Sequence, residues 1–315
     1  MSHEPQSLSV VIPVYKSASI LPLLVERLEP VLNDLSGDYE LILVNDGSPD
    51  ISWNVVRELA ETHSWIRGID LMRNYGQHNA LLCGISEARH EVIVTMDDDL
   101  QHPPEVLPKL LEHLTEDVDV VYGTPETEQH GFWRDIASQV TKLALQSAMG
   151  VDVAKSVSAL RAFRTPVRDA FSHYAGSFVS VDVLLTWGTT RFTAVGVPHQ
   201  SRASGPSNYT FRKLIIHALN MMTGFSTVPL QLASVLGFGS TVFGLMVLVY
   251  VIGNWLMIGS VVPGFAFLAS TVAIFSGIQL FALGIIGEYL ARMHFRVMDR
   301  PPFSIRTTTG DGQHD

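Results

Sequence analysis

The fold is decided by residues 8–48, which read LSVVIPVYKSASILPLLVERLEPVLNDLSGDYELILVNDGS. The first part of this stretch, LSVVIPVY (8–15), is almost continuously apolar, as in a buried strand, and a helical pattern follows at residues 21–35. A second strand-like run, YELILVNDGS (39–48), then ends in acidic and turn-forming residues. A strand, a helix and another strand in this order predict two parallel strands joined by a crossover helix.

The same alternation continues along the first half of the chain and then loosens. Further strands are predicted at residues 65–72, 91–99, 117–123 and 189–199, and further helices at residues 73–88, 104–114 and 133–149. This order indicates an α/β fold class with a doubly wound, mostly parallel sheet. Open sheets of this kind bind ligands beyond the carboxyl ends of their strands, which is where Tyr15, Asp46, Arg73 and Asn74 fall.

The second half of the chain contains a long uncharged segment. No Asp, Glu, Lys or Arg occurs between residues 214 and 287, in a chain that is 47% hydrophobic and 17% charged overall. Residues 232–258 and 265–287 are each long enough to cross a hydrocarbon core of roughly 30 Å. Because the helices of a soluble hairpin rarely lack charges on every face, the pattern excludes a wholly soluble protein and predicts a two-helix membrane hairpin.

Basic residues flank this hairpin on both sides. Arg212 and Lys213 precede it, and Arg292, Arg296 and Arg300 follow it. Since positively charged flanks stay in the cytoplasm, we expect both ends of the hairpin to be cytoplasmic. The first twenty residues lack the long apolar core of a signal peptide, so the head is expected on the same side. The sequence thus predicts a two-pass integral protein of the inner membrane, with its head and both termini cytoplasmic.

The net charge of −10 is unevenly distributed along the chain. Residues 1–135 hold 8 Lys and Arg against 24 Asp and Glu, whereas residues 136–213 hold 9 against 3. The basic segment leads directly into the uncharged one. A basic stretch beside a membrane anchor fits anionic lipid headgroups or an anionic lipid substrate, although a solvated basic surface without a ligand gives the same pattern. No nucleic-acid partner is expected.

Three adjacent carboxylates, Asp97, Asp98 and Asp99, end the strand predicted at residues 91–99. Neighbouring like charges repel one another, so their placement at a strand tip suggests a shared cation, and carboxylate oxygens suit Mg²⁺ or Mn²⁺. Side-chain alternation predicts Asp97 and Asp99 on one side of the strand and Asp98 on the other. An acidic loop with no ligand is the alternative, and the further carboxylate of Asp46 at a neighbouring strand end favours the cation.

A set of motifs, in the order in which they occur, carries a resemblance to a known family. They are SVVIPVY (9–15), LVNDGS (43–48), LMRNYGQHNAL (71–81), MDDDLQHPPE (96–105), SALRAFR (158–164), GPSNY (205–209) and IIGEYLARM (285–293). Together they resemble the family-two glycosyltransferases that load a sugar onto polyprenyl phosphate. These are relatives of dolichyl-phosphate mannose synthase, bactoprenol glucosyltransferases and undecaprenyl-phosphate aminoarabinose transferases. The resemblance covers nearly the whole chain and implies the nucleotide-diphospho-sugar transferase (GT-A) form of the α/β fold.

The resemblance implies a nucleotide-sugar donor, a polyprenyl phosphate acceptor and a divalent cation, Mg²⁺ or Mn²⁺. The implied nucleotide-sugar-binding residues are Pro13, Tyr15, Asp46, Asp97 and Asp98, and the implied metal ligands are Asp97, Asp99 and Gln101. The residues implied at the acceptor phosphate are Arg161, Arg202, Ser207 and Tyr209, since arginine offers a planar fork of donors to a phosphate. The implied catalytic residues are Asp97, Asp99 and Arg202, with Asp152 as a candidate base. For Arg161 and Arg164, pairing within the fold is an equal alternative.

The chain departs from the family pattern at several positions. Lys16 and Ser17 replace a frequent Asn-Glu pair, so recognition of the base is expected to differ. Pro125 replaces a frequent Arg, and Lys155 stands where some relatives carry an Asp proposed as the base. A protein base is not required, because a phosphate monoester has a second pKa of about 6 and is already an anionic nucleophile near neutral pH. Positioning and charge neutralisation would then supply most of the catalysis.

These features favour an inverting glycosyltransferase that makes a polyprenyl-monophosphate sugar at the cytoplasmic membrane face. The departures leave open a catalytically idle membrane protein that binds a nucleotide sugar or organises a partner. The expected organisation is a catalytic head (1–200), an acceptor loop with juxtamembrane helices (201–231), two membrane helices (232–290) and a cytoplasmic tail (291–315). The resemblance also implies a homo-oligomer, with a tetramer as the expected state.

Overall fold

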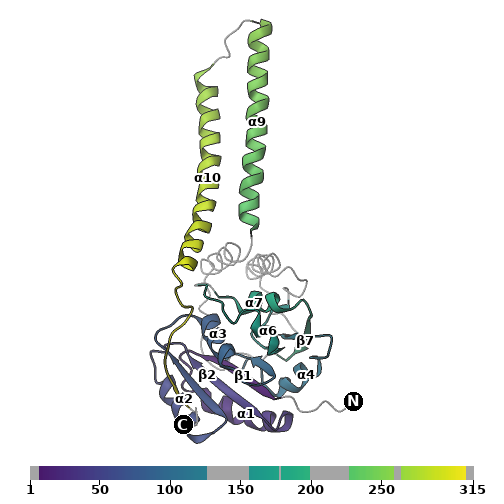
Figure 1. Ribbon diagram of the computed structural model, residues 1–315, viewed down its shortest axis with the longest axis vertical. Helices are drawn as coiled ribbons and strands as arrows, with labels where there is room; N and C mark the ends of the chain where they lie inside the picture. The colour runs from purple at the N-terminus through teal and green to yellow at the C-terminus, as the bar shows by residue number, and fades with distance from the viewer. Residues whose placement is uncertain (1–6, 126–155, 177–178, 199–226, 259–263, 310–315) are drawn as a thin grey trace.

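The computed structural model of the chain describes residues 7–125, 156–176, 179–198, 227–258 and 264–309. Figure 1 shows a head built around one sheet, from which two long helices rise as a hairpin. The strands are β1 (Leu8–Val14), β2 (Tyr39–Asn45), β3 (Ile66–Leu71), β4 (Val92–Thr95), β5 (Val120–Pro125), β6 (Arg161–Arg164), β7 (Phe192–Val197) and β8 (Ile305–Thr309). The helices are α1 (Leu21–Leu35), α2 (Ser52–Thr62), α3 (Gln77–Glu87), the 3-10 helix η1 (Pro104–Val106), α4 (Leu107–Glu112), α6 (Pro166–Asp169), α7 (Val181–Gly188), α9 (Val228–Ile258) and α10 (Phe265–Val297).

The described part of the chain forms an eight-stranded sheet in the order β7-β5-β6-β4-β1-β2-β3-β8. Strands β4, β1, β2 and β3 run parallel to one another. Strands β5 and β7 run in the same direction as these four, whereas β6 and β8 run in the opposite direction. The predicted doubly wound, mostly parallel sheet is therefore confirmed.

Helices cover both faces of the sheet. Residues of α1, α2 and α4 form one core cluster with Val10, Ile12 and other strand residues, while residues of α3 and α7 form a second cluster with Val11 and Ile42. Successive strand side chains point to opposite faces, so strands such as β1 and β2 contribute to both clusters. Because both faces are covered, β1 is almost continuously apolar and is buried along its whole length.

The order of the strands reverses after β3. Strands β1, β2 and β3 follow one another across the sheet, and β4 then lies on the other side of β1. This reversal makes the carboxyl ends of β1 and β4 a topological switch point, where open α/β sheets bind ligands.

Strand β4 ends at Thr95, rather than at residue 99 as predicted. Asp97, Asp98 and Asp99 therefore lie beyond the strand, and Leu100, with a φ of 56°, turns the chain away. The predicted strand end at residue 99 is wrong, so the loop after β4, rather than alternation along a strand, places the three carboxylates. The physical reason is that the layers on both faces of the sheet are apolar, and a buried carboxylate without partners is costly there.

Two antiparallel strands differ from the sequence prediction. Strand β6 has four residues and an arginine at each end, so it contains no apolar run that indicates a strand. Strand β8, IRTTT, is mostly polar and exposed, as an edge strand can be. The tail predicted at residues 291–315 is thus in part a strand of the head.

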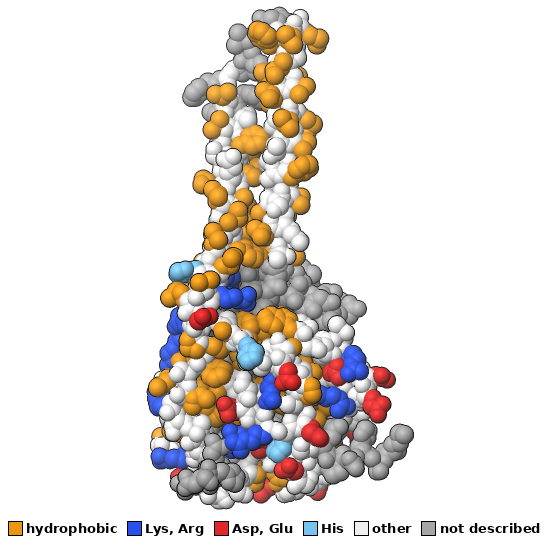
Figure 2. Space-filling model, viewed as in Figure 1, with side chains coloured by type: hydrophobic (Ala, Val, Ile, Leu, Met, Phe, Trp, Pro, Cys, Tyr) orange, Lys and Arg blue, Asp and Glu red, His pale blue; other side chains and the backbone are white. Residues whose placement is uncertain are grey.

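The helices α9 and α10 form the hairpin. Both are long and apolar enough to cross a membrane, over Val228–Met257 and Ile274–Val297. In Figure 2, hydrophobic side chains cover the hairpin, whereas acidic and basic side chains gather on the head and at the base of the hairpin. Length and composition of the two helices agree with the predicted membrane hairpin.

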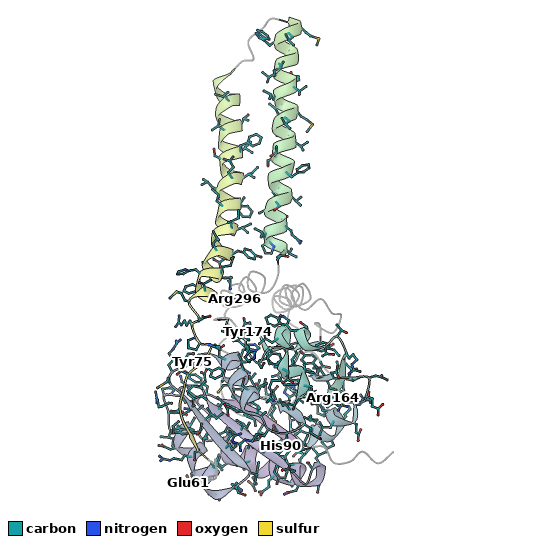
Figure 3. The ribbon with its side chains drawn as sticks, in the orientation of Figure 1. Glu61, Tyr75, His90, Arg164, Tyr174 and Arg296 are labelled. Atoms are coloured by element: carbon teal, nitrogen blue, oxygen red, sulfur yellow. The ribbon has the colours of Figure 1, made fainter. Side chains whose placement is uncertain are left out.

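Helix α10 continues past residue 287, where its membrane segment was expected to end. Glu288 and Arg292 form an ion pair of 2.8 Å one turn apart, which stabilises a helix in polar surroundings. One turn further, Arg296 forms a side-chain hydrogen bond with Tyr174 of the head, and the two residues lie close together in Figure 3. The last turns of α10 therefore connect the hairpin to the head.

Helix α3 lies very close to the sheet at Gly84. A β-carbon at this position would lie 2.4 Å from Cγ1 of Val11 and 3.0 Å from Cγ2 of Val44. The substitution Gly84→Ala is expected to lower the free energy of unfolding by about 1–3 kcal/mol, because the helix or the strands must shift. Urea denaturation of the full-length protein in detergent measures the change. Gly37→Ala is the control, since a β-carbon at Gly37 meets nothing within 4 Å; equal stability of the two variants would contradict the close packing.

Candidate functional site

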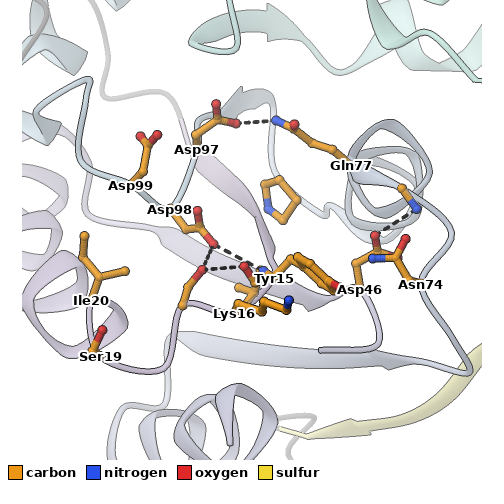
Figure 4. Close-up of a pocket in the computed structure, with 14 residues that line it drawn as sticks. Tyr15, Lys16, Ser19, Ile20, Asp46, Asn74, Gln77, Asp97, Asp98 and Asp99 are labelled. Atoms are coloured by element: carbon orange, nitrogen blue, oxygen red, sulfur yellow. Dashed lines mark hydrogen bonds between the residues drawn. The ribbon is translucent and has the colours of Figure 1, made fainter. Parts of the chain in front are cut away.

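A cavity of about 400 Å³ opens at the switch point, beyond the carboxyl ends of β1, β2 and β4. Its lining comes from four segments that are far apart in the sequence, namely residues 13–20, Asp46, residues 74–77 and residues 97–99. Figure 4 shows these segments meeting around one space. The volume lies within the range of sites that bind small molecules and cofactors.

The segment after β1 turns sharply and forms one wall of the cavity. Lys16 has a φ of 59°, which is uncommon for a residue other than glycine, and its N–H donates to Oγ of Ser48 at 3.1 Å. The N–H of Ser17 donates to Oγ of Ser52 at 3.0 Å. Tyr15 is 45% exposed, and Nζ of Lys16 lies 5.4 Å from the centre of its ring. This wall thus presents an aromatic face and a cation to the cavity.

Asp46 follows β2 and holds the segment between β3 and α3. Its two carboxylate oxygens accept hydrogen bonds from the N–H groups of Tyr75 (2.7 Å) and Gly76 (2.9 Å). The neighbouring Gly47 has a φ of 58°, and a β-carbon there would lie 2.5 Å from the backbone of Arg73, so only glycine permits this close approach. Burial raises the pKa of the Asp46 carboxyl, against the effect of the two N–H groups and Arg73. Asp46 therefore shapes the wall that it lines.

Asp98 faces the segment after β1. Its carboxylate accepts a hydrogen bond from the hydroxyl of Ser17 and another, at 3.4 Å, from the N–H of Tyr15 (Figure 4). Burial raises the pKa of Asp98 to about 6; the charge of Asp99 acts in the same direction, and the two hydrogen bonds oppose both. Because the charge of this partly buried carboxylate is only partly compensated, a cation beside Asp98 would be favourable.

Asp97 and Asp99 point in other directions than Asp98 (Figure 4). Oδ1 of Asp97 accepts a hydrogen bond from Nε2 of Gln77 at 2.5 Å, and Oδ1 of Asp99 accepts one from the N–H of Gln101 at 3.1 Å. Both carboxylates line the cavity, whereas Gln101 is absent from its lining. Within the described ranges, no group of three or more His, Cys, Asp or Glu side chains is arranged to hold a metal ion. A cation here would therefore need further oxygen ligands from a substrate or from water.

Arg161 is buried in β6 and pairs within the fold. Its Nη1 lies 2.6 Å from Oδ1 of Asp182 in α7, and the same oxygen accepts a hydrogen bond from the hydroxyl of Tyr122 at 3.1 Å. Arg164 donates to two backbone carbonyl groups. The structure favours the structural alternative for both arginines, so the predicted phosphate-binding role of Arg161 is not supported. The reason is that Asp182, which is also buried, needs a cation nearby.

The cavity brings together all five nucleotide-sugar residues predicted from the sequence. These are Pro13, Tyr15, Asp46, Asp97 and Asp98, together with Asp99 from the predicted metal ligands. The candidates Asp152, Arg202, Ser207 and Tyr209 lie outside the described residues, as does the helix predicted at residues 133–149. The sequence interpretation missed Gln77, which lines the cavity and contacts Asp97. Its position as a polar residue at the start of a helix, just after a strand, could have identified it.

Comparison with known proteins gives matches over nearly the whole chain. Residues 9–171 match the family described as Glycosyl transferase family 2. The chain is 33% identical over 311 residues to the undecaprenyl-phosphate 4-deoxy-4-formamido-L-arabinose transferase of Photorhabdus laumondii, covering 98% of this chain and 96% of the relative. It is 34% identical over 300 residues to the protein of the same name from Pseudomonas aeruginosa, covering 94% and 88%.

A solved structure with a similar fold is glucosyl-3-phosphoglycerate synthase from Mycobacterium tuberculosis, in complex with Mn²⁺, UDP-glucose and phosphoglyceric acid. The TM-score is 0.50 at 16% sequence identity, and the match covers 69% of this chain and 78% of that one. At this identity the likeness supports the fold alone.

The pairing of Arg161 with Asp182 can be tested by removing its charges singly and together. Arg161→Met leaves a buried carboxylate without its cation and is expected to lower the free energy of unfolding by about 3–5 kcal/mol. Adding Asp182→Asn is expected to restore most of this loss, because the amide still accepts from Tyr122 and no charge remains unpaired. Urea denaturation of the two variants in detergent measures both values. A double variant as unstable as the single one would show that charge pairing is not the role of Arg161.

Proposed function

The chain belongs to glycosyl transferase family 2, and from this premise we propose that it transfers a sugar from a nucleotide-diphosphate sugar to a polyprenyl phosphate of the undecaprenyl type. The product is a polyprenyl-monophosphate sugar with inverted anomeric configuration. The observation that carries this proposal is the likeness to two relatives named as undecaprenyl-phosphate sugar transferases. It extends over 94% of the chain or more and so includes the hairpin as well as the head.

The hairpin agrees with an acceptor that is confined to the membrane. A polyprenyl chain stays in the hydrocarbon layer because transfer of its many apolar groups to water is unfavourable. Helices α9 and α10, which can cross such a layer, attach the head with its cavity to the same membrane. An enzyme of this build can receive a soluble donor on the head and a lipid acceptor at the membrane surface.

We assign the donor to the cavity at the switch point. The exposed ring of Tyr15 can stack on the base, and the carboxylates of Asp46 and Asp98 can accept hydrogen bonds from the nucleoside. Pro13 has no N–H group that would need a partner at the cavity wall. Asp97 is assigned to the side of the cavity that faces the diphosphate.

A divalent cation, Mg²⁺ or Mn²⁺, fits the residues of this site. Asp97 and Asp99 supply carboxylate oxygens, and Mg²⁺ is usually held by one or two carboxylates together with substrate phosphates and water. The partly buried and partly compensated carboxylate of Asp98 adds to the attraction for a cation. When bound, the ion would neutralise the diphosphate as it leaves. Gln101 stays a predicted ligand, since its contact with Asp99 is through its backbone N–H.

In the proposed reaction an oxygen of the acceptor phosphate attacks the anomeric carbon of the donor sugar. The bond from this carbon to the diphosphate oxygen breaks, and the nucleoside diphosphate leaves with the electron pair. Because the phosphate is already anionic near neutral pH, no protein base is required. The residues of the chain orient the two substrates and neutralise their charges.

Several assignments stay predictions because the residues lie outside the described ranges. They are Arg202, Ser207 and Tyr209 at the acceptor phosphate, and Asp152 as a base. A two-pass inner-membrane location with the head and both termini cytoplasmic rests on the basic flanks of the hairpin. The division of the chain at residues 200, 231 and 290 and the homotetramer are likewise predictions.

The proposed activity is tested by a panel of nucleotide-diphosphate sugars offered to the purified protein with undecaprenyl phosphate. Transfer of radiolabelled sugar to the lipid, separated by thin-layer chromatography, is the expected result for at least one donor. The alternative, an idle nucleotide-sugar-binding or scaffold protein, predicts donor binding or donor hydrolysis without a glycolipid. A panel with binding but no lipid product for any donor would replace the proposal with that alternative.

The substitution Asp99→Ala is expected to lower kcat by roughly 100-fold or more, because it removes a charged group that would hold the cation against the leaving diphosphate. Chelation of divalent ions with EDTA should abolish transfer by the unchanged protein, and added Mg²⁺ or Mn²⁺ should restore it. Asp34→Ala is the matched control, since Asp34 is an exposed carboxylate on α1 outside the cavity lining. Full metal-dependent activity of the Asp99 variant would refute its role.

A further inference from the structure

The chain returns from the membrane hairpin to the head as the edge strand β8, which pairs with β3. In Figure 1 the yellow segment descends from α10 along the head, and β8 lies near α2. Helix α10 ends at Val297, and β8 begins soon afterwards at Ile305 and pairs with β3. The register of this pairing is irregular between Asp70 and Leu71, at the end of β3 that leads to the cavity. The base of the hairpin is thus joined to the segment that follows β3.

Arg306 of β8 makes two contacts at this irregular point. Its Nη1 donates to Oδ2 of Asp70 at 3.2 Å, and its Nη2 donates to the carbonyl oxygen of Met72 at 2.8 Å. Beside these contacts, the N–H of Met72 donates to the carbonyl oxygen of Ser304 at 2.9 Å. One guanidinium therefore holds both β3 and the first residue beyond it.

Asp70 carries this contact to the neighbouring strand β2. Its carboxylate is 4% exposed, and its Oδ1 accepts a hydrogen bond from Nδ2 of Asn45 at 2.6 Å. Oδ1 of Asn45 is buried and has no hydrogen-bond partner within the described residues, so Asp70 orients the Asn45 amide. Without Arg306 the charge of Asp70 would stay buried beside one neutral side-chain donor, which favours movement of the carboxylate toward water.

The two contacts of Arg306 lead toward the donor cavity, one through Asp70 to Asn45 and the other through Met72. Asn45 directly precedes Asp46, and Met72 directly precedes residues 73–76. These two branches meet again where the Asp46 carboxylate accepts the two N–H groups at the end of residues 73–76. Residues of the same segment line the cavity. Hydrogen bonds therefore connect Arg306 of β8 to the cavity wall by two routes, one through Asp70 and Asn45 and one through Met72.

We propose that Arg306 is a positioning residue of the donor site, which fixes residues 73–76 through Asp70 and Met72 and so links the exit of the membrane hairpin to donor affinity. The part of this inference that concerns donor affinity rests on the proposed function, whereas the part that concerns the cavity wall does not. Because the Arg306 side chain is 55% exposed, water weakens its pairing with Asp70. The effect on donor affinity is expected in the lower range for coupled residues, roughly two- to tenfold.

Hydrogen exchange of the full-length protein in detergent, followed by mass spectrometry, tests the structural part. In Arg306→Ala, the amides of Tyr75 and Gly76 should exchange several times faster than in the unchanged protein, while peptides of α4 keep their rates. Arg306→Lys should give an intermediate rate, since lysine keeps the charge but cannot hold both oxygens with one planar group. Arg300→Ala is the matched control, because Arg300 is an exposed arginine of the same tail.

Kinetics of the same variants test the functional part. Arg306→Ala should raise KM for the donor while KM for undecaprenyl phosphate and kcat change little, and Arg306→Lys should recover part of the donor KM. Unchanged exchange at Tyr75 and Gly76 would overturn the inference, as would faster exchange throughout the head, which indicates a loss of stability only. Faster local exchange with both KM values unchanged would overturn the link to donor affinity. If the unchanged protein transfers no sugar, the proposed function fails, and the exchange data still decide whether Arg306 positions the wall.

Discussion

Strand β1 pairs in parallel with β2 along its whole length, but with β4 only from Leu8 to Val11. Beyond that point the polar segments that follow β1 and β4 form opposing walls of the cavity. Pro13 lacks an N–H group but is tolerated near the centre of the sheet. Its backbone nitrogen points to the same edge of β1 as the backbone of Val11, and β4, the neighbouring strand on that edge, has already ended there. The cavity and the placement of its carboxylates depend on this separation of two strands.

Several carboxylates line the cavity, and hydrogen bonds from neutral donors compensate their negative charge only in part. Backbone N–H groups bind Asp46, a hydroxyl binds Asp98 and a side-chain amide binds Asp97. Hydrogen bonds of this kind orient a carboxylate without removing its charge. A cation together with a diphosphate would complete the balance, since the ion attracts both the carboxylates and the phosphates. The geometry of the site thus agrees with the chemistry of the family to which the chain belongs.

The head and the hairpin are connected at more than one place. Helix α10 contacts the head through Arg296 and Tyr174, and the chain that follows α10 becomes strand β8. A strand that pairs with the edge of a sheet shares its backbone hydrogen bonds with that sheet. The chain that leaves the hairpin is consequently part of the same hydrogen-bonded sheet as the strands that lead to the cavity wall. The hairpin is thus connected to the head by hydrogen bonds as well as by the chain itself.

Much of the fold could be predicted from the sequence: α1 occupies residues 21–35 as predicted, β1 and β2 lie within the apolar runs, and the uncharged segment contains most of the hairpin. Such features follow from local periodicity, because burial on a strand or helix repeats with the period of that element. Three other features could not be predicted from the sequence: the end of β4, the pairing of Arg161 with Asp182, and the contact of Arg306 with Asp70 across 236 residues of chain. These features depend on which distant segments become neighbours. The residues around a charged side chain in the sequence do not reveal which residue it will pair with or whether its charge will be buried.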